Sequence, residues 1–182
     1  MDRFKVAAAA MSVLIVGACG PTTRGLRTDM PKDAVPAERA RLVLYQPSLL
    51  FGLSEMRVQI DGKGTCGIAG LEAIAWDIAP GQHRLSMFSN ATAGTSVLTL
   101  DFEAGKTTYV SASRNHKQAT ATFFAGSWGA RATSDESSPH GGAFVLQKEA
   151  LETGEREIAG LTTAACPFQG ITPGSVTRNR AQ

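Results

Sequence analysis

The sequence predicts a mainly β protein, a small antiparallel β-sandwich of about seven strands, with a long loop and a short C-terminal helix. Short segments of the chain alternate between apolar and polar residues, which is the period of a half-buried strand. Turn residues separate these segments about every eight to twelve residues, as in known sandwiches. No long helical pattern interrupts residues 40–113, which argues against a parallel sheet with crossover helices.

The domain is expected to begin at Ala40 and to end at Cys166. Alternating or β-branched segments predict strands over residues 40–46, 56–60, 66–68, 74–78, 83–88, 95–102, 107–113 and 143–147. Asp61-Gly62, Pro80-Gly81 and Gly105 are expected to make the turns between them. Glycine at these places supplies the positive φ angle that such turns require.

Two segments depart from this strand pattern. Residues 114–142 are polar and rich in Gly and Ser, and we expect them to form a long loop inserted in the sandwich. Residues 148–161 are compatible with a short helix interrupted at Gly154. The tail at 167–182 is expected to be flexible.

The expected loop contains three aromatic residues, Phe123, Phe124 and Trp128. Aromatic side chains in such a segment can anchor a partner, because Trp is enriched at interface hot spots. Alternatively, they fold back and cap one end of the sandwich, which would add apolar burial to a small domain. The capping interpretation is favoured, and partner binding is kept as the alternative.

The N-terminus has the organisation of an export signal. Arg3 and Lys5 precede an apolar stretch over residues 6–16, which is of signal-peptide length and too short to span a bilayer. An apolar residue, two small residues and a cysteine follow, in the order Val16-Gly17-Ala18-Cys19.

This order resembles the lipobox of bacterial lipoproteins. The resemblance implies removal of residues 1–18 by cleavage between Ala18 and Cys19, and attachment of diacylglycerol and a further acyl chain at Cys19. It also implies a lipid anchor in the outer membrane, facing the periplasm. An ordinary secretory signal with a coincidental cysteine, or a membrane-buried N-terminal helix, would be the alternatives.

Residues 19–39 are expected to be a lipidated flexible tether, because Pro21, Pro31 and Pro36 disfavour helix there. If Cys19 carries lipid, the pair Cys66 and Cys166 remains. An even pair in an oxidising compartment favours a disulfide, and two buried free thiols are the alternative.

Composition and motifs exclude several functions. The net charge is +2 and the basic residues are scattered, so we expect no nucleic-acid partner. His83, His116 and His140 lack ligand spacing, so no metal site is expected. No nucleophile elbow or phosphate-binding loop is present in the sequence, so we expect no catalytic residues, no cofactor and no enzymatic activity.

Three motifs carry a family resemblance: Val58-Gln59-Ile60-Asp61-Gly62-Lys63-Gly64, the stretch from Trp76 through Pro80-Gly81 to Leu85, and the segment 104–110. Together they resemble an uncharacterised bacterial lipoprotein family, domain of unknown function 2846. They are more distantly similar to PEGA-type and carboxypeptidase-regulatory-like sandwiches. The resemblance covers residues 40–114 and implies a sandwich fold, because its motifs are mostly turn residues.

The sequence therefore predicts a membrane-anchored envelope lipoprotein whose β-sandwich has a structural or binding role. Its partners would be the membrane, through the lipid anchor, and an unidentified envelope protein or ligand. The alternative is a carrier of a small ligand or lipid, with a pocket between the sheets or beneath the aromatic segment.

Overall fold

The computed structural model describes residues 30, 33–48, 56–90, 92–135 and 137–164. The expected signal peptide, the lipidation site at Cys19, most of the expected tether, Cys166 and the expected flexible tail lie outside the described residues.

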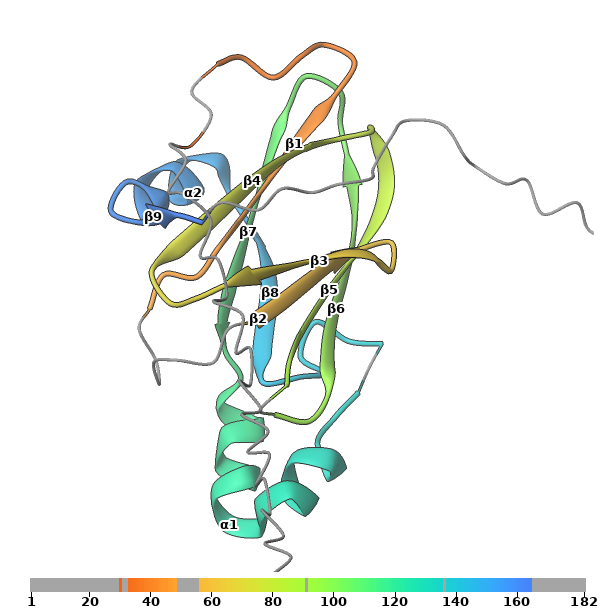
Figure 1. The fold of residues 1–182 in the computed structure, drawn as a ribbon, viewed down its shortest axis with the longest axis vertical. Helices are drawn as coiled ribbons and strands as arrows, with labels where there is room; N and C mark the ends of the chain where they lie inside the picture. Colours follow the sequence, from red (N-terminus) through yellow and green to blue (C-terminus); the bar gives the residue numbers. More distant parts are fainter. Residues whose placement is uncertain (1–29, 31–32, 49–55, 91, 136, 165–182) are drawn as a thin grey trace, which may run out of the picture.

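The described residues form nine strands and two helices (Figure 1). In chain order they are β1 (Ala40–Tyr45), β2 (Met56–Ile60), β3 (Lys63–Ile68), β4 (Glu72–Ile78), β5 (Gly81–Ser89), β6 (Thr95–Phe102), β7 (Thr107–Arg114), α1 (His116–Ala132), β8 (Phe144–Glu149), α2 (Leu151–Ile158) and β9 (Thr162–Thr163). One sheet has the strand order β8-β7-β1-β4-β9 and the other β3-β2-β5-β6. The mainly β sandwich expected from the sequence is confirmed.

Not every strand pair is antiparallel. β1 runs parallel to β7, and β4 runs parallel to the short β9. The pair β1–β7 is parallel because the chain leaves the first sheet after β4, builds β5 and β6 in the second sheet, and returns beside β1. No alternation pattern distinguishes a parallel from an antiparallel neighbour, so this feature had no signal in the sequence.

The turns have the expected glycine conformations. Asp61 and Gly62 both have positive φ, at 53° and 70°, and they connect β2 to β3. Gly81 and Gly105 also have positive φ, at 120° and 72°, at the starts of the segments leading to β5 and β7. These four residues set the strand registers that bring the two apolar faces together.

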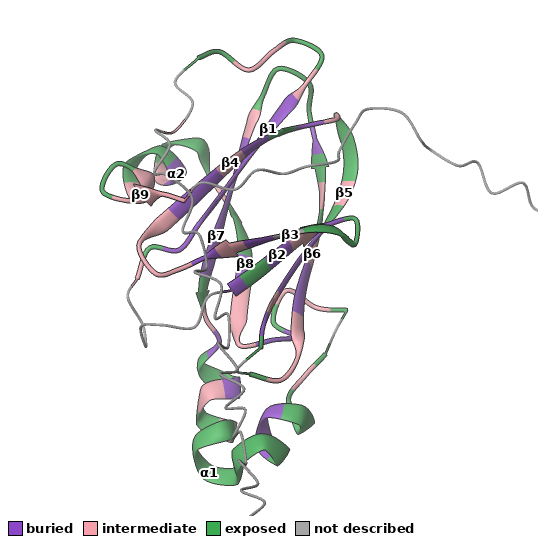
Figure 2. Cartoon of the chain, in the orientation of Figure 1, coloured by how far each residue is buried: buried purple, intermediate pink, exposed green. Residues whose placement is uncertain are grey.

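The main core lies between the two sheets. Its fully buried side chains come from alternate positions of both sheets and include Leu42, Leu44, Ile74, Ile78, Met56, Val58, Ile60, Leu85 and Met87. A second, smaller cluster lies on the outer face of the five-stranded sheet, around Val43, Tyr45, Ala73 and Tyr109. Every residue of β1 is therefore buried, because both faces of this strand are covered (Figure 2).

Helix α2 covers part of that outer face. The sequence predicts an interruption at Gly154, yet the helix passes through this residue without a break. A Cβ atom built on Gly154 would lie 2.2 Å from Cγ of Tyr109, so glycine allows the helix backbone to rest on the ring. The Tyr45 hydroxyl donates to Glu157 Oε2 at 2.8 Å, which fixes the other end of the helix.

The expected loop over 114–142 is wrong for residues 116–132, which form α1. The glycines misled the sequence interpretation because they do not all act as helix breakers. Gly126 has φ 59° and ψ −144° and divides α1 into two helical halves. Gly129 lies where the halves meet, and a Cβ there would lie 2.1 Å from the carbonyl oxygen of Ala121. We call residues 116–132 the α1 hairpin.

Candidate functional site

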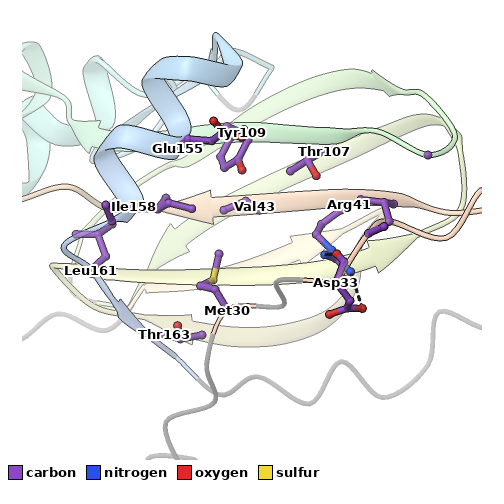
Figure 3. A pocket seen from close by; sticks show the side chains of 14 residues that line it. Met30, Asp33, Arg41, Val43, Thr107, Tyr109, Glu155, Ile158, Leu161 and Thr163 are labelled. Atoms are coloured by element: carbon purple, nitrogen blue, oxygen red, sulfur yellow. Dashed lines mark hydrogen bonds and ion pairs between the residues drawn. The ribbon is translucent and has the colours of Figure 1, made fainter.

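Two surfaces of the molecule are candidates for binding. The first is a pocket on the outer face of the five-stranded sheet, with a volume of about 780 Å³ (Figure 3). Its floor is made by β1 and β7, and α2, the turn into β9 and the segment containing Met30 and Asp33 surround it. The pocket is therefore neither between the sheets nor beneath the aromatic segment, which were the two expected places.

One end of this pocket is apolar. Val43 lies on the floor, and Ile158, Leu161 and Met30 pack around it as parts of the smaller cluster. Figure 3 shows these four side chains gathered at one end, with Thr107 and Arg41 toward the other. The lining has the composition of a small-molecule site, in which apolar walls meet a few polar groups.

Arg41 forms the polar end and is 4% exposed. Its Nε and Nη2 atoms donate to the two carboxylate oxygens of Asp77 at 2.7 and 3.0 Å, and Nη1 donates to the carbonyl oxygen of Asp33 at 2.8 Å. The hydrogen bond to Asp77 is the main reason that the pKa of Arg41 lies above its ordinary value. Because two aspartates already face this guanidinium, it is poorly placed to attract a further anion.

The Arg41 contacts also change the description of the expected tether. Residues 33–39 lie against the sheet, and Gly105 N–H donates to the carbonyl oxygen of Arg39 at 2.6 Å. This segment therefore forms part of the pocket wall instead of a free linker. Only residues before it remain as the expected tether, and they lie outside the described residues except for Met30.

The second surface is the α1 hairpin, which extends from one end of the sandwich (Figure 1). Phe123, Phe124 and Trp128 are 84%, 80% and 80% exposed. The expectation that they cap the sandwich is therefore wrong. The hairpin turns back on itself at Gly126, which carries these side chains away from the body (Figure 2).

The base of the hairpin, by contrast, is held firmly. Asn115 is buried, caps α1 by accepting from the N–H of Gln118, and donates to the carbonyl oxygens of His140 and Gly142 at 2.7 and 2.9 Å. The buried amide of Gln118 donates to the carbonyl oxygen of Ala93 at 2.8 Å and to that of Ala130 at 3.4 Å. The aromatic residues are thus presented on a fixed support.

Sequence reasoning missed Asn115 and Gln118, although a signal was present. Asparagine is among the preferred N-cap residues, and a glutamine three positions later is typical of a helix start. Arg41 and the residues of the pocket had no such signal, because they come from distant parts of the chain. Their proximity depends on how the two sheets and α2 assemble.

Cys66 is disulfide-bonded and lies in the main core. Its partner is outside the described residues, so the pairing with Cys166 stays a prediction. Ala164 packs against the same core, and its N–H donates to the carbonyl oxygen of Ala73 at 2.9 Å. Two residues of chain span about 7 Å, so Cys166 is within reach of this part of the core.

The three histidines do not form a common site. His83 places Nδ1 2.7 Å from Asp61 Oδ2 and Nε2 2.8 Å from the carbonyl oxygen of Ala79, so it fastens the turn at Asp61. Burial raises the pKa of Asp61, but hydrogen bonds from Arg84 N–H and His83 outweigh it, so this pKa lies below its ordinary value. Across the described residues, no cluster of three or more His, Cys, Asp or Glu side chains could hold a metal ion.

Within the described part of the chain, no helix has the length and apolar character needed to cross a membrane. No protein-family model and no curated protein sequence matches this chain. The fold and the two surfaces, the pocket and the α1 hairpin, are therefore the basis on which a function can be argued.

Proposed function

We propose that this protein is a lipid-anchored envelope protein that acts by binding, without catalysis, through the α1 hairpin. The observation that carries the proposal is the exposure of Phe123, Phe124 and Trp128 on a rigidly held support. Water-soluble proteins rarely expose large apolar side chains together unless the patch binds something. The lipobox at residues 16–19 supports the membrane anchor.

The arrangement of the chain suits an anchored binding protein. The described N-terminal segment, residues 33–39, lies toward one end of the long axis in Figure 1, and α1 lies at the other. An anchor joined to this segment would leave the hairpin free to meet a partner. Binding would thus take place away from the point at which the tether enters the domain.

The anchor is tested by feeding cells a fatty-acid analogue and comparing the wild-type protein with a Cys19→Ala variant. We expect label on the wild type alone and recovery of the wild type in the outer-membrane fraction. Cys66→Ala serves as the matched control, because this cysteine has no lipobox, and its label should equal that of the wild type. An unlabelled, soluble wild-type protein would contradict the proposed anchor.

The binding role of α1 is tested by crosslinking in cells, with a photoreactive residue in place of Ser127 beside Trp128. We expect crosslinks to a discrete envelope component. The same residue in place of Thr99, which is exposed on β6, is the control surface. Equal crosslinking from both positions would argue against a specific role for α1.

A second candidate function is carriage of a small amphiphile. It is favoured by the pocket of about 780 Å³, whose apolar end lies against α2 and whose polar end is formed by Arg41. Native mass spectrometry of protein purified from cells should then show an added mass. That mass should be lost in a Thr107→Phe variant, which fills the floor, and kept in Thr99→Phe on the other sheet. A mass retained in both variants, or absent from the wild type, would exclude this function.

A further inference from the structure

The tip and the base of the α1 hairpin have different chemistry. The tip carries Phe123, Phe124 and Trp128, all exposed, and the two phenylalanine rings stack edge to face with centroids 5.3 Å apart. The base carries Lys117 on the outgoing half and Arg131 on the returning half, and both are exposed. The hairpin contains no aspartate or glutamate.

We infer that the α1 hairpin inserts its aromatic tip into the interfacial region of an anionic lipid bilayer, while Lys117 and Arg131 face the headgroup phosphates. The inference rests on the proposed function, because the lipid anchor is what brings α1 near a membrane. It goes further by naming a bilayer surface as the partner of the hairpin.

The dimensions of the hairpin agree with this placement. Phe123 follows Lys117 by six residues, which in an α-helix corresponds to an axial rise of about 9 Å. Interfacial segments bury their apolar side chains about 5–10 Å into the boundary between headgroups and acyl chains. The basic residues would therefore remain at the level of the phosphates when the tip is inserted.

The residue types also favour a bilayer. Trp is enriched at membrane interfaces, where the ring is in apolar surroundings and the N–H stays near water. Basic residues near an anionic surface each strengthen binding by about fivefold. A hairpin with no acidic residue therefore has the charge that complements an anionic surface.

The size of the patch argues against a protein partner or a second copy of the chain. A large aromatic side chain buries about 200 Å², so three of them supply about 600 Å² in total. A stable protein interface takes about 800 Å² from each partner. A bilayer has no such threshold, because each inserted side chain contributes separately.

The direct test uses fluorescence of the full chain in vesicles that contain lipids brominated on the acyl chains. The chain has two tryptophans, and Trp76 is buried in the main core, so quenching by bromine reports on Trp128. We expect strong quenching of the wild type and almost none in a Trp128→Phe variant. Quenching only by water-soluble iodide would overturn the inference.

A second measurement separates insertion from lipid anchoring. The Cys19→Ser chain, which has no attached lipid, is titrated with anionic and with neutral vesicles. We expect anionic vesicles to bind at least about tenfold more tightly, and raised salt to remove this preference. Equal binding to both vesicle types would contradict the role given to Lys117 and Arg131.

Variants then show which apolar side chains enter the bilayer. Phe123→Ser with Phe124→Ser should weaken the binding of the Cys19→Ser chain at least about tenfold. Leu151→Ser is the matched control, because Leu151 is 56% exposed but lies on α2, and it should leave binding unchanged. An equal loss in both variants would show that binding is not a property of α1.

These outcomes distinguish the two proposals. If the wild type takes up no fatty acid but the Cys19→Ser chain still inserts Trp128, the anchor is wrong and the inference stands. If the lipidated chain sits on vesicles without quenching of Trp128, the anchor stands and the inference is wrong. Self-association that Phe124→Ser abolishes, with no vesicle binding, would identify a second copy as the partner instead.

Discussion

The two helices of this protein make opposite use of their side chains. Helix α2 has eight residues and lies on the five-stranded sheet, with Gly154 against the Tyr109 ring and Glu157 bonded to Tyr45. Helix α1 has 17 residues, yet only its base is buried and its three largest side chains face outward. The shorter helix completes the structure of the domain, whereas the longer one is built to meet something else. Helix length is therefore no guide to which helix the fold depends on.

The largest expected effect tests the α2 side of this comparison. Gly154→Ala places a methyl group among three atoms of Tyr109, at 2.2, 2.5 and 2.6 Å, so the helix must move off the ring. We expect the free energy of unfolding to fall by about 3 kcal/mol, the upper range for overpacking. Denaturant titration measures this loss.

Gly160→Ala is the control for this variant, because a Cβ at Gly160 meets no atom within 4 Å. Its stability should stay within about 0.5 kcal/mol of the wild type. If Gly154→Ala were equally harmless, α2 would not be held to the sheet by this contact. The contrast between the two helices would then lose its main support.

The strands could be predicted from the sequence because they have local signals. Val58 and Ile60 alternate with polar neighbours, and Asp61-Gly62 adopts the turn that this dipeptide favours. The cost of a register shift reinforces these signals, since a shift by one residue would turn Val58 and Ile60 out of the core. Local pattern and global packing agree along most of the sandwich.

The candidate sites could not be predicted in the same way. The pocket depends on Arg41, Tyr109 and Leu161, which lie far apart in the sequence and meet only after α2 and β9 are in place. The three aromatic residues were identified, but their exposure was not, because burial depends on where Gly126 turns the helix. A glycine in a sequence does not reveal whether it ends a helix, kinks it or allows close packing.

The next effect tests how the base of α1 is held. Asn115→Ala removes the helix cap and leaves the carbonyl oxygens of His140 and Gly142 without this donor. Loss of an N-cap costs about 1 kcal/mol, and the buried carbonyl oxygens add to it, so we expect a loss of 1–2 kcal/mol in total. Thermal unfolding, followed together with helix content by circular dichroism, measures both changes.

Asn115→Asp is the informative companion to that variant. It keeps the acceptor that caps α1 but replaces the donor with a carboxylate that faces two carbonyl oxygens. We expect it to be no more stable than Asn115→Ala. A fully stable Asn115→Asp protein would show that the cap alone, and not the bonds to residues 140 and 142, holds the hairpin base.

A smaller effect concerns pH and α2. The chain has two tyrosines, Tyr45 and Tyr109, and both contact α2. Burial raises the pKa of each above its ordinary value, and the hydrogen bond to Glu157 adds to the shift at Tyr45. A raised pKa in the folded state means that the stabilisation is complete below about pH 10 and is lost as the pH rises above it.

At about one pH unit above the ordinary tyrosine value, we expect a loss of about 1 kcal/mol from Tyr45. Unfolding by denaturant at several alkaline pH values measures it, and absorbance of tyrosinate follows the ionisation. In Tyr45→Phe, which has no ionisable group at this position, the pH dependence should be smaller. An unchanged dependence would show that Tyr45 ionises without disturbing α2.

The smallest expected effect tests the α1 side. Phe123→Ser combined with Phe124→Ser removes two large apolar side chains that are more than three-quarters exposed. Because the folded protein barely shields them from water, their loss should change the free energy of unfolding by less than about 0.5 kcal/mol. Denaturant titration without lipid checks this, beside the membrane-binding measurement on the same variant. A large loss of stability would mean that the rings pack against the protein in solution, and the capping interpretation would then replace the exposed tip. Unchanged stability together with lost binding would assign these side chains to a partner rather than to the fold.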